Sequence, residues 1–202
     1  EKLPKHINKN TKAVIAVHLY GRACNMNKLT EITKKYNLIL IEDCAQAAGA
    51  AWGNKKVGSW GDFGCFSFYP TKNIGAYGDG GAILTNNEDD CKKLEAMRFY
   101  GQKDKKICSM FGINSRLDEI HAAILNVKLK YLDKWNNKRK KAAKLYKDLI
   151  TNSDIILPAA TNANEHVYYL FVARARNRNA VIKKLSQHNI ISLIHYPTAL
   201  NR

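Results

Sequence analysis

Asp43, Ser67 and Lys72 are the side chains whose types and surroundings could carry out chemistry together. Asp43 follows an apolar run, Ser67 lies within an aromatic run, and Lys72 lies in a turn with four glycines between positions 75 and 81. Such a density of glycines indicates close backbone packing or positive φ angles. We expect this turn to be largely desolvated, which disfavours an ammonium group and makes the lysine amine a nucleophile.

A nucleophilic lysine can form a Schiff base with an aldehyde, and pyridoxal phosphate is the aldehyde that proteins commonly use. That cofactor needs a lysine, a carboxylate facing its ring nitrogen and a cradle for its phosphate. Lys72, Asp43 and Ser67 could supply these groups. Two alternatives remain open at this point. The turn could cradle a nucleotide phosphate, although it lacks the Gly-x-x-x-x-Gly-Lys-Ser/Thr pattern, and Asp43 could simply cap the small-residue turn over 44–50.

The elements that must position these residues form an α/β pattern. Ala13–Val17 and 38–41 are short apolar runs typical of buried parallel strands, and apolar residues recur at helical spacing over 26–36 between them. Strand, helix and strand in this order form a βαβ unit, so the sheet is at least partly parallel. Because ligands bind at the carboxyl ends of strands in such sheets, Asp43 lies where chemistry is expected. Further elements are predicted as strands over 65–69 and 82–85 and a helix over 87–100.

The second half of the chain predicts a long helix and the beginning of another unit. Apolar residues follow a 3.6-residue period from 116 to about 149. A boundary is expected over 158–166, followed by a strand at 167–172, a helix at 179–188 and a strand at 190–194. The predicted division is therefore the second half of a large domain over 1–115, a connecting helix over 116–157, and the start of a small α/β domain over 158–202.

Composition excludes several classes of protein. Of 202 residues, 46% are hydrophobic and 25% charged, which is typical of a globular chain and excludes disorder. The net charge is +16, and residues 91–150 hold 16 basic against 6 acidic side chains. The basic run at 138–141 is interpreted as a solvated helix face, because no nucleic-acid motif accompanies it.

The five cysteines are odd in number and have no zinc spacing, so we expect free thiols in a reducing cytoplasm and no metal site. No apolar run has the roughly 18 residues that a membrane span needs.

Successive blocks of the sequence resemble the DegT/DnrJ/EryC1/StrS aminotransferases, which are pyridoxal-phosphate enzymes. The resemblance runs from about residue 10 to 199 and rests on these blocks: VHLYG at 17–21, IEDCAQAAGA at 41–50, FSFYPTKNIGAYGDGGAI at 66–83, NSRLDEIHAAI at 114–124 and LIHYP at 193–197. It implies the three-layer α/β fold of aspartate aminotransferase-like transferases. The large domain would be incomplete, because family members are nearly twice as long, and both ends look cut.

The resemblance also implies roles for individual residues. Lys72 would hold pyridoxal phosphate covalently and move protons, and Asp43 would pair with the ring nitrogen of the cofactor. The remaining roles are as follows: Gln46 would lie near the cofactor ring, Ser67 would bind the phosphate, Asn114 would reach the phosphate in a neighbouring subunit, and His18, Tyr69 and His195 would line the substrate site. For the last three residues, packing is an equally weighted alternative.

Members of this family aminate keto sugars attached to nucleotides. The blocks imply a cytoplasmic homodimer with shared active sites, acting in amino-sugar and polysaccharide biosynthesis on a substrate such as a dTDP-3-keto-6-deoxyhexose, with glutamate as amino donor. Lys72 argues against the dehydratase branch, in which histidine replaces this lysine. The alternative is a truncated, inactive aminotransferase-like scaffold or a basic binding protein. Partners other than the sugar nucleotide and the amino donor, such as a nucleic acid or a membrane, are not expected.

Overall fold

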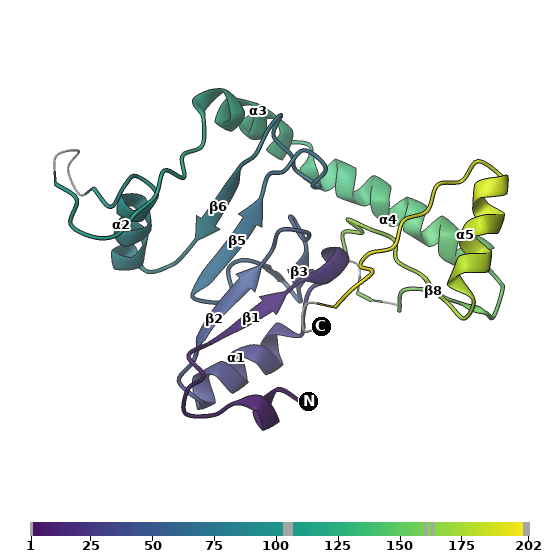
Figure 1. The fold of residues 1–202 in the computed structure, drawn as a ribbon, viewed down its shortest axis with the longest axis horizontal. Coiled ribbons are helices and arrows are strands. Elements are labelled where there is room, and N and C mark those ends of the chain that lie inside the picture. Colours follow the sequence, from purple (N-terminus) through teal and green to yellow (C-terminus); the bar gives the residue numbers. More distant parts are fainter. Residues whose placement is uncertain (1, 103–106, 160, 163, 200–202) are drawn as a thin grey trace.

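A computed structural model describes residues 2–102, 107–159, 161–162 and 164–199 (Figure 1). Its main sheet has four strands in the order β1-β2-β5-β6, with bounds Ala13–Val17, Ile39–Asp43, Phe63–Ser67 and Gly81–Leu84. The first three strands are parallel and β6 is antiparallel to β5. The α/β prediction and the partly parallel sheet are therefore confirmed.

Helix α1, Met26–Lys35, packs against one face of this sheet (Figure 1). The Asn25 side chain accepts a hydrogen bond from the Lys28 backbone N–H and so caps the first turn of the helix. Met26 is fully buried and packs with Val14, Ala16 and Leu40. Because side chains alternate along a strand, this packing buries one face of β1 and β2.

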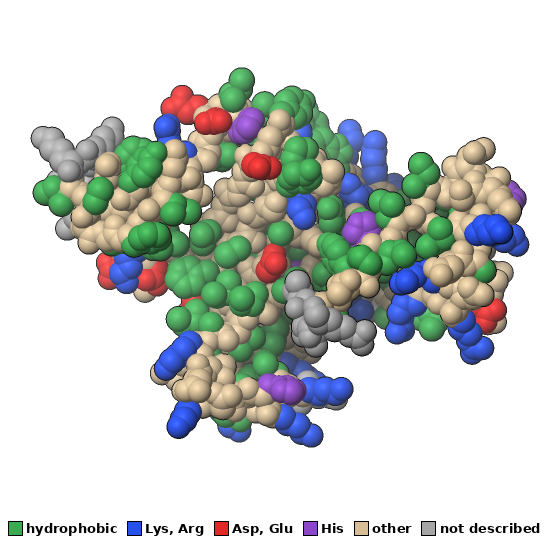
Figure 2. Space-filling view, in the orientation of Figure 1, with side chains coloured by type: hydrophobic (Ala, Val, Ile, Leu, Met, Phe, Trp, Pro, Cys, Tyr) green, Lys and Arg blue, Asp and Glu red, His purple; other side chains and the backbone are tan. Residues whose placement is uncertain are grey.

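The opposite face of the sheet is open within the described residues. Ile15 is 64% exposed, and Ile39 and Ile83 are 45% and 51% exposed. Ile15 pairs with Ile41 in the ladder, and Cys65 pairs with Ile83, so these residues share one face. Figure 2 shows hydrophobic side chains gathered over the sheet on this side of the molecule.

The predicted long helix is two helices, which corrects the expectation for residues 116–149. Helix α3 spans Glu119–Leu129 and α4 spans Leu132–Leu149. Between them the Tyr131 N–H donates to the Lys128 carbonyl, three residues back, which tightens the chain and interrupts the α-helical ladder. No glycine or proline marks this break, so the hydrophobic period runs through it. Helix α2 spans Glu88–Met97.

Two predicted strands near the carboxyl end are wrong. Residues 167–172 and 190–194 are not strands; instead β7, Ile155–Ile156, pairs with β8, Arg174–Ala175, before helix α5, Arg178–Gln187. Val167 is fully buried against the core of the large sheet unit, so its hydrophobicity reflects tertiary packing rather than strand pairing. Residues 190–194 have no neighbouring strand among those the structure describes.

Short elements complete the fold: the hairpin strands β3, Ala51–Trp52, and β4, Lys55–Lys56, and the 3₁₀ turns Leu3–His6 and Leu19–Gly21. Across the described ranges, no helix combines the length and apolar character that a membrane crossing requires.

Candidate active site

The carboxyl ends of β2 and β5 bring Asp43 and Ser67 to the same edge and the same face of the sheet. Asp43 pairs with Cys65 in the parallel ladder, and Ser67 lies two residues further along β5. Since side chains two residues apart point to the same face, Asp43, Cys65 and Ser67 share the open face. This is the edge at which α/β sheets bind ligands.

Asp43 also forms the local turn that the capping alternative predicted. Its Oδ1 accepts a hydrogen bond of 3.0 Å from the Ala45 backbone N–H. The carboxylate is nevertheless half-buried rather than enclosed. Both interpretations of Asp43 are therefore compatible with its position, because a hydrogen bond to one carboxylate oxygen leaves acceptor capacity for a ligand.

Lys72 lies in the turn after β5, but it is less enclosed than expected. Its backbone N–H donates to the Tyr69 carbonyl at 2.9 Å, and its side chain is half-buried rather than largely desolvated. The Nζ atom lies 4.6 Å from the ring centroid of Tyr169. No pattern near Lys72 in the sequence indicates this contact, because Tyr169 is 97 residues further along the chain.

The glycines after Lys72 are required by close packing and not by positive φ angles. A Cβ atom on Gly75 would lie 2.5 Å from the Pro70 carbonyl oxygen, and one on Gly81 would lie 2.8 Å from the Phe66 carbonyl oxygen. Neither contact is sterically tolerable, since backbone atoms cannot move aside as a flexible side chain does. The turn can therefore fold back on β5 only with glycine at these positions.

Gln46 connects two of the sequence blocks. Its Oε1 accepts from the Tyr20 backbone N–H at 2.6 Å, and its Nε2 donates to the Tyr196 hydroxyl at 2.9 Å. The Tyr20 hydroxyl donates to the His195 carbonyl at 2.6 Å. The structure therefore brings Tyr196 to Gln46 and the His195 backbone to Tyr20, whereas Tyr69 is 51% exposed beside the Lys72 turn.

Asn114 lies on an exposed segment between α2 and α3, where it forms a β-bridge with Phe99. Within the described part of the chain, no hydrogen bond joins it to Asp43, Ser67 or Lys72. A role for Asn114 in a neighbouring subunit stays a prediction.

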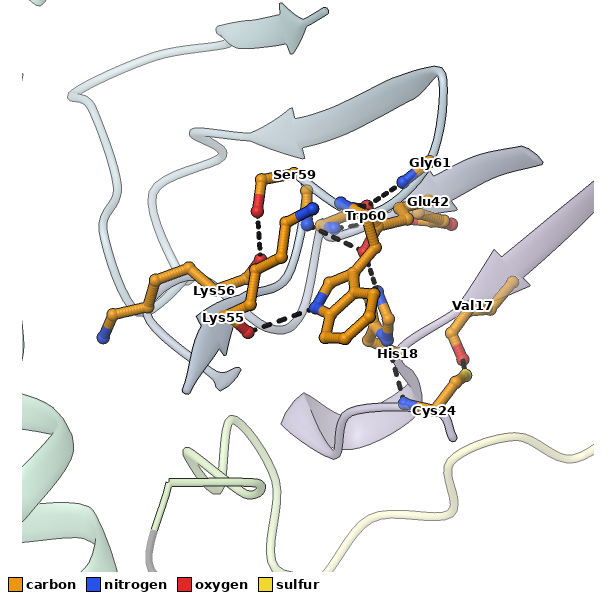
Figure 3. Close-up of polar contacts among 12 residues, drawn as sticks. Val17, His18, Cys24, Glu42, Lys55, Lys56, Ser59, Trp60 and Gly61 are labelled. Atoms are coloured by element: carbon orange, nitrogen blue, oxygen red, sulfur yellow. Dashed lines mark hydrogen bonds and ion pairs between the residues drawn. The ribbon is translucent and has the colours of Figure 1, made fainter. Parts of the chain in front are cut away.

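His18 is fully buried, which favours the packing alternative over a place in the substrate site (Figure 3). Its Nδ1 accepts from the Cys24 backbone N–H, and its Nε2 faces Glu42 Oε2, both at 3.0 Å. Burial acts to lower the pKa of His18, while its hydrogen bond to Glu42 acts to raise it. The Cys24 N–H decides the tautomer, because it can donate only to an unprotonated nitrogen. We therefore assign a neutral ring that donates from Nε2.

Glu42 accepts four hydrogen bonds in this buried position (Figure 3). Burial acts to raise its pKa, but His18 and the backbone N–H groups of Gly58, Gly61 and Trp60 hold the pKa below its usual value. His18, Glu42 and Cys44 place three possible metal-ligand atoms within 4.8 Å of one another. Each carboxylate oxygen of Glu42 already accepts two hydrogen bonds. These hydrogen bonds within the fold account for the cluster.

Chemically, the candidate site offers a carboxylate at Asp43 and a hydroxyl at Ser67 on one edge of the sheet, and an amine at Lys72 in the turn that follows β5. An amine of this kind can form a Schiff base with an aldehyde. A carboxylate of this kind can hold a protonated ring nitrogen. The Ser67 Oγ accepts from the Tyr69 N–H at 3.3 Å, which leaves its own proton available for an anionic ligand.

The fold and sequence are similar to known aminotransferases. The dTDP-3-amino-3,6-dideoxy-α-D-galactopyranose transaminase of Aneurinibacillus thermoaerophilus is 50% identical over 97% of this chain and 54% of that protein. The crystal structure of DesV from S. venezuelae in complex with a ketimine intermediate is 37% identical with a TM-score of 0.94, covering 98% of this chain and 54% of that one.

A third similar protein, NtdA from Bacillus subtilis with bound cofactor PMP, is 31% identical with a TM-score of 0.87, covering 97% of this chain and 46% of that one. The chain thus spans about half the length of the relatives it matches. The model of the DegT/DnrJ/EryC1/StrS aminotransferase family matches residues 1–202, and the chain belongs to this family.

Proposed function

We propose that the whole protein is a pyridoxal-phosphate-dependent aminotransferase that converts a nucleotide-linked keto sugar to an amino sugar. The observation that supports this proposal is that Asp43 and Ser67 share one edge and one face of the sheet, with Lys72 in the turn that follows β5. A dTDP-3-keto-6-deoxyhexose is the proposed substrate, because the relative with 50% identity is named for a dTDP-3-amino-3,6-dideoxyhexose. Glutamate is the proposed amino donor.

The residues present fit the cofactor by their chemistry. When bound, pyridoxal phosphate withdraws electrons from the carbon that exchanges its proton. Lys72 would hold the cofactor and move that proton, and Asp43 would keep the ring nitrogen protonated. Ser67 would donate to the phosphate, and Gln46 would lie beside the ring. Tyr69 and His195 remain candidates for the substrate site; for His18 the proposal is a packing role, in line with its burial.

Several features of the whole protein belong to the same proposal. We place it in the cytoplasm as a homodimer, with Asn114 serving the partner's phosphate site. The domain division at 115 and 157 is also proposed. In this division, the Tyr20–His195 hydrogen bond joins the large domain to the start of the small one.

The competing proposal is that a chain of this length is an inactive scaffold or a basic binding protein. The half-burial of Lys72 supports it, because the sequence predicted a largely desolvated lysine at this position. Such a scaffold predicts retention of polyanions that falls with salt and survives loss of Lys72.

The test is intact-mass spectrometry of the 202-residue chain after incubation with pyridoxal phosphate and borohydride. We expect one cofactor-sized adduct that maps to Lys72, is lost in Lys72→Ala and is retained in Lys134→Ala, which removes an exposed lysine of α4. No adduct at Lys72 in a folded chain would favour the scaffold. The full-length protein would then be assayed with dTDP-keto sugar and glutamate.

A further inference from the structure

Tyr169 covers Lys72 although it belongs to the unit predicted to start at residue 158. The Lys72 Nζ atom lies 4.6 Å from its ring centroid, within the range of a cation–π contact. The Tyr169 hydroxyl lies 3.5 Å from Thr71 Oγ1, so the same ring contacts two consecutive residues of the turn. Tyr169 itself is half-buried, so burial of its apolar surface alone does not account for its position.

The backbone that carries Tyr169 is fixed on both sides. The Val167 N–H donates to the Gly21 carbonyl at 2.9 Å, and Asn73 Nδ2 donates to the Val167 carbonyl at 3.3 Å. From α4, Arg139 Nη1 donates to the carbonyls of Tyr168 and Tyr169 at 3.3 and 3.4 Å. Since Asn73 follows Lys72 directly, the lysine turn and the tyrosine segment hold each other in place.

Gly21 shows how closely the segment that carries Tyr169 packs against residue 21. A Cβ atom on Gly21 would lie 3.0 Å from the Tyr169 backbone nitrogen and 2.9 Å from the Gln46 carbonyl oxygen. Gly21 also has a φ of 94°, which L side chains rarely adopt. The backbone around Tyr169 therefore has little room to move. This holds the Tyr169 ring in its contact with Lys72.

We propose that Tyr169 is a positioning residue for Lys72, holding its amine against the ring at the carboxyl edge of the sheet. The inference rests on the proposed function, in which Lys72 is the amine that reacts. A ring face attracts an ammonium through its quadrupole. Tyr169 therefore restricts the conformations of the Lys72 side chain. It also limits the reaction of the Lys72 amine with adventitious electrophiles.

The experiment is trace acetylation of the full 202-residue chain at neutral pH, without cofactor, with the labelling of each lysine measured by peptide mass spectrometry. Tyr169→Leu removes the ring, and we expect labelling of Lys72 to rise about two- to fivefold, the factor that a contact of this kind supplies. Tyr169→Phe keeps the ring face and should leave Lys72 near its wild-type labelling. That rescue distinguishes a ring contact from a general packing role.

Lys128 is an internal control with a similar ring contact: its Nζ lies 4.6 Å from the Tyr77 ring centroid and also donates to the Gly75 carbonyl. Its labelling should not change in Tyr169→Leu, whereas Tyr77→Leu should raise labelling of Lys128 and not of Lys72. If all lysines become more reactive in Tyr169→Leu, the unfolded variant is replaced by Tyr169→Met, which keeps a flexible apolar side chain without a ring.

Unchanged Lys72 labelling in a folded variant without the ring overturns the proposal, and so does an equal rise in Tyr169→Phe. Because the labelling uses no pyridoxal phosphate, its outcome is separate from that of the borohydride test. An adduct at Lys72 with no effect of Tyr169 would leave the proposed function standing and remove the positioning role.

Discussion

At the scale of single residues, Glu42 is a buried carboxylate whose two oxygens each accept two hydrogen bonds. It is fully buried and accepts from His18 and from three backbone N–H groups of the turn that follows β4. A buried carboxylate in such surroundings stabilises the folded state only while it is ionised. Glu42 thus ties the end of β1, through His18, to the entry into β5.

We predict that Glu42→Gln lowers the free energy of unfolding by about 3 kcal/mol at pH 7, because an amide cannot accept from all four donors. The lowered pKa of Glu42 makes this contribution complete above its unfolded value of 4.5, and it is lost as the pH falls through the folded pKa. Urea unfolding from pH 7 to pH 3 should show the variant and wild type converging in acid. The exposed Glu95→Gln should run parallel to wild type, and a constant gap for Glu42→Gln would contradict the linkage.

At the scale of elements, helix α4 is joined to the lysine turn through buried amides. Asn136 is 2% exposed; its Oδ1 accepts from Asn73 Nδ2 at 2.7 Å, and its Nδ2 donates to the Ala48 carbonyl at 3.0 Å. Removing one partner of such a pair leaves a buried polar group unsatisfied. The position of the turn thus depends on a helix 63 residues away in sequence.

We predict that Asn136→Ala costs about 2 kcal/mol of folding stability, since Asn73 and Ala48 lose their partner. In a double-mutant cycle, Asn73→Ala and Asn136→Ala should show a coupling of about 1 kcal/mol, as residues sharing a hydrogen bond do. The neighbouring Asn137→Ala is exposed and should be close to neutral. Strict additivity of Asn73 and Asn136 in chemical denaturation would show that α4 does not support the turn in this way.

Elements with one regular period were predictable from the sequence, and those set by distant contacts were not. Helix 26–36 and strands 13–17 and 38–41 were found within two residues, because burial on one face or both imposes their patterns. Residues 167–172 have the composition of a strand, but the Val167 backbone hydrogen-bonds to Gly21 and Asn73 instead of to a neighbouring strand. In the site, the locations of Asp43, Ser67 and Lys72 could be predicted from where they stand relative to the strands along the chain. The contact of Lys72 with Tyr169 could not, because it depends on tertiary structure.

At the scale of the whole molecule, the main sheet is covered by a helix on one face and open on the other within the described residues. The open face carries Ile15, Ile39 and Ile83, each at least 45% exposed. Parallel sheets are normally covered on both faces, and a contiguous apolar surface of this kind favours association.

We therefore predict that the isolated 202-residue chain self-associates with rising concentration. Ile15→Lys should reduce association in sedimentation velocity, since it places a charge on the open face at little cost in stability. Ala16→Lys, on the adjacent residue that is 4% exposed, should unfold the chain instead. Equal association of wild type and Ile15→Lys would show that another surface is responsible.

The contact between Thr71 and Tyr169 joins residues 98 positions apart, and the Tyr20–His195 hydrogen bond joins residues 175 apart. Contacts of such sequence separation require closure of a long loop, whose entropic cost rises with loop length. During synthesis, the turn that carries Lys72 leaves the ribosome well before Tyr169 exists. The amine therefore acquires this neighbour only after a further 97 residues have been made.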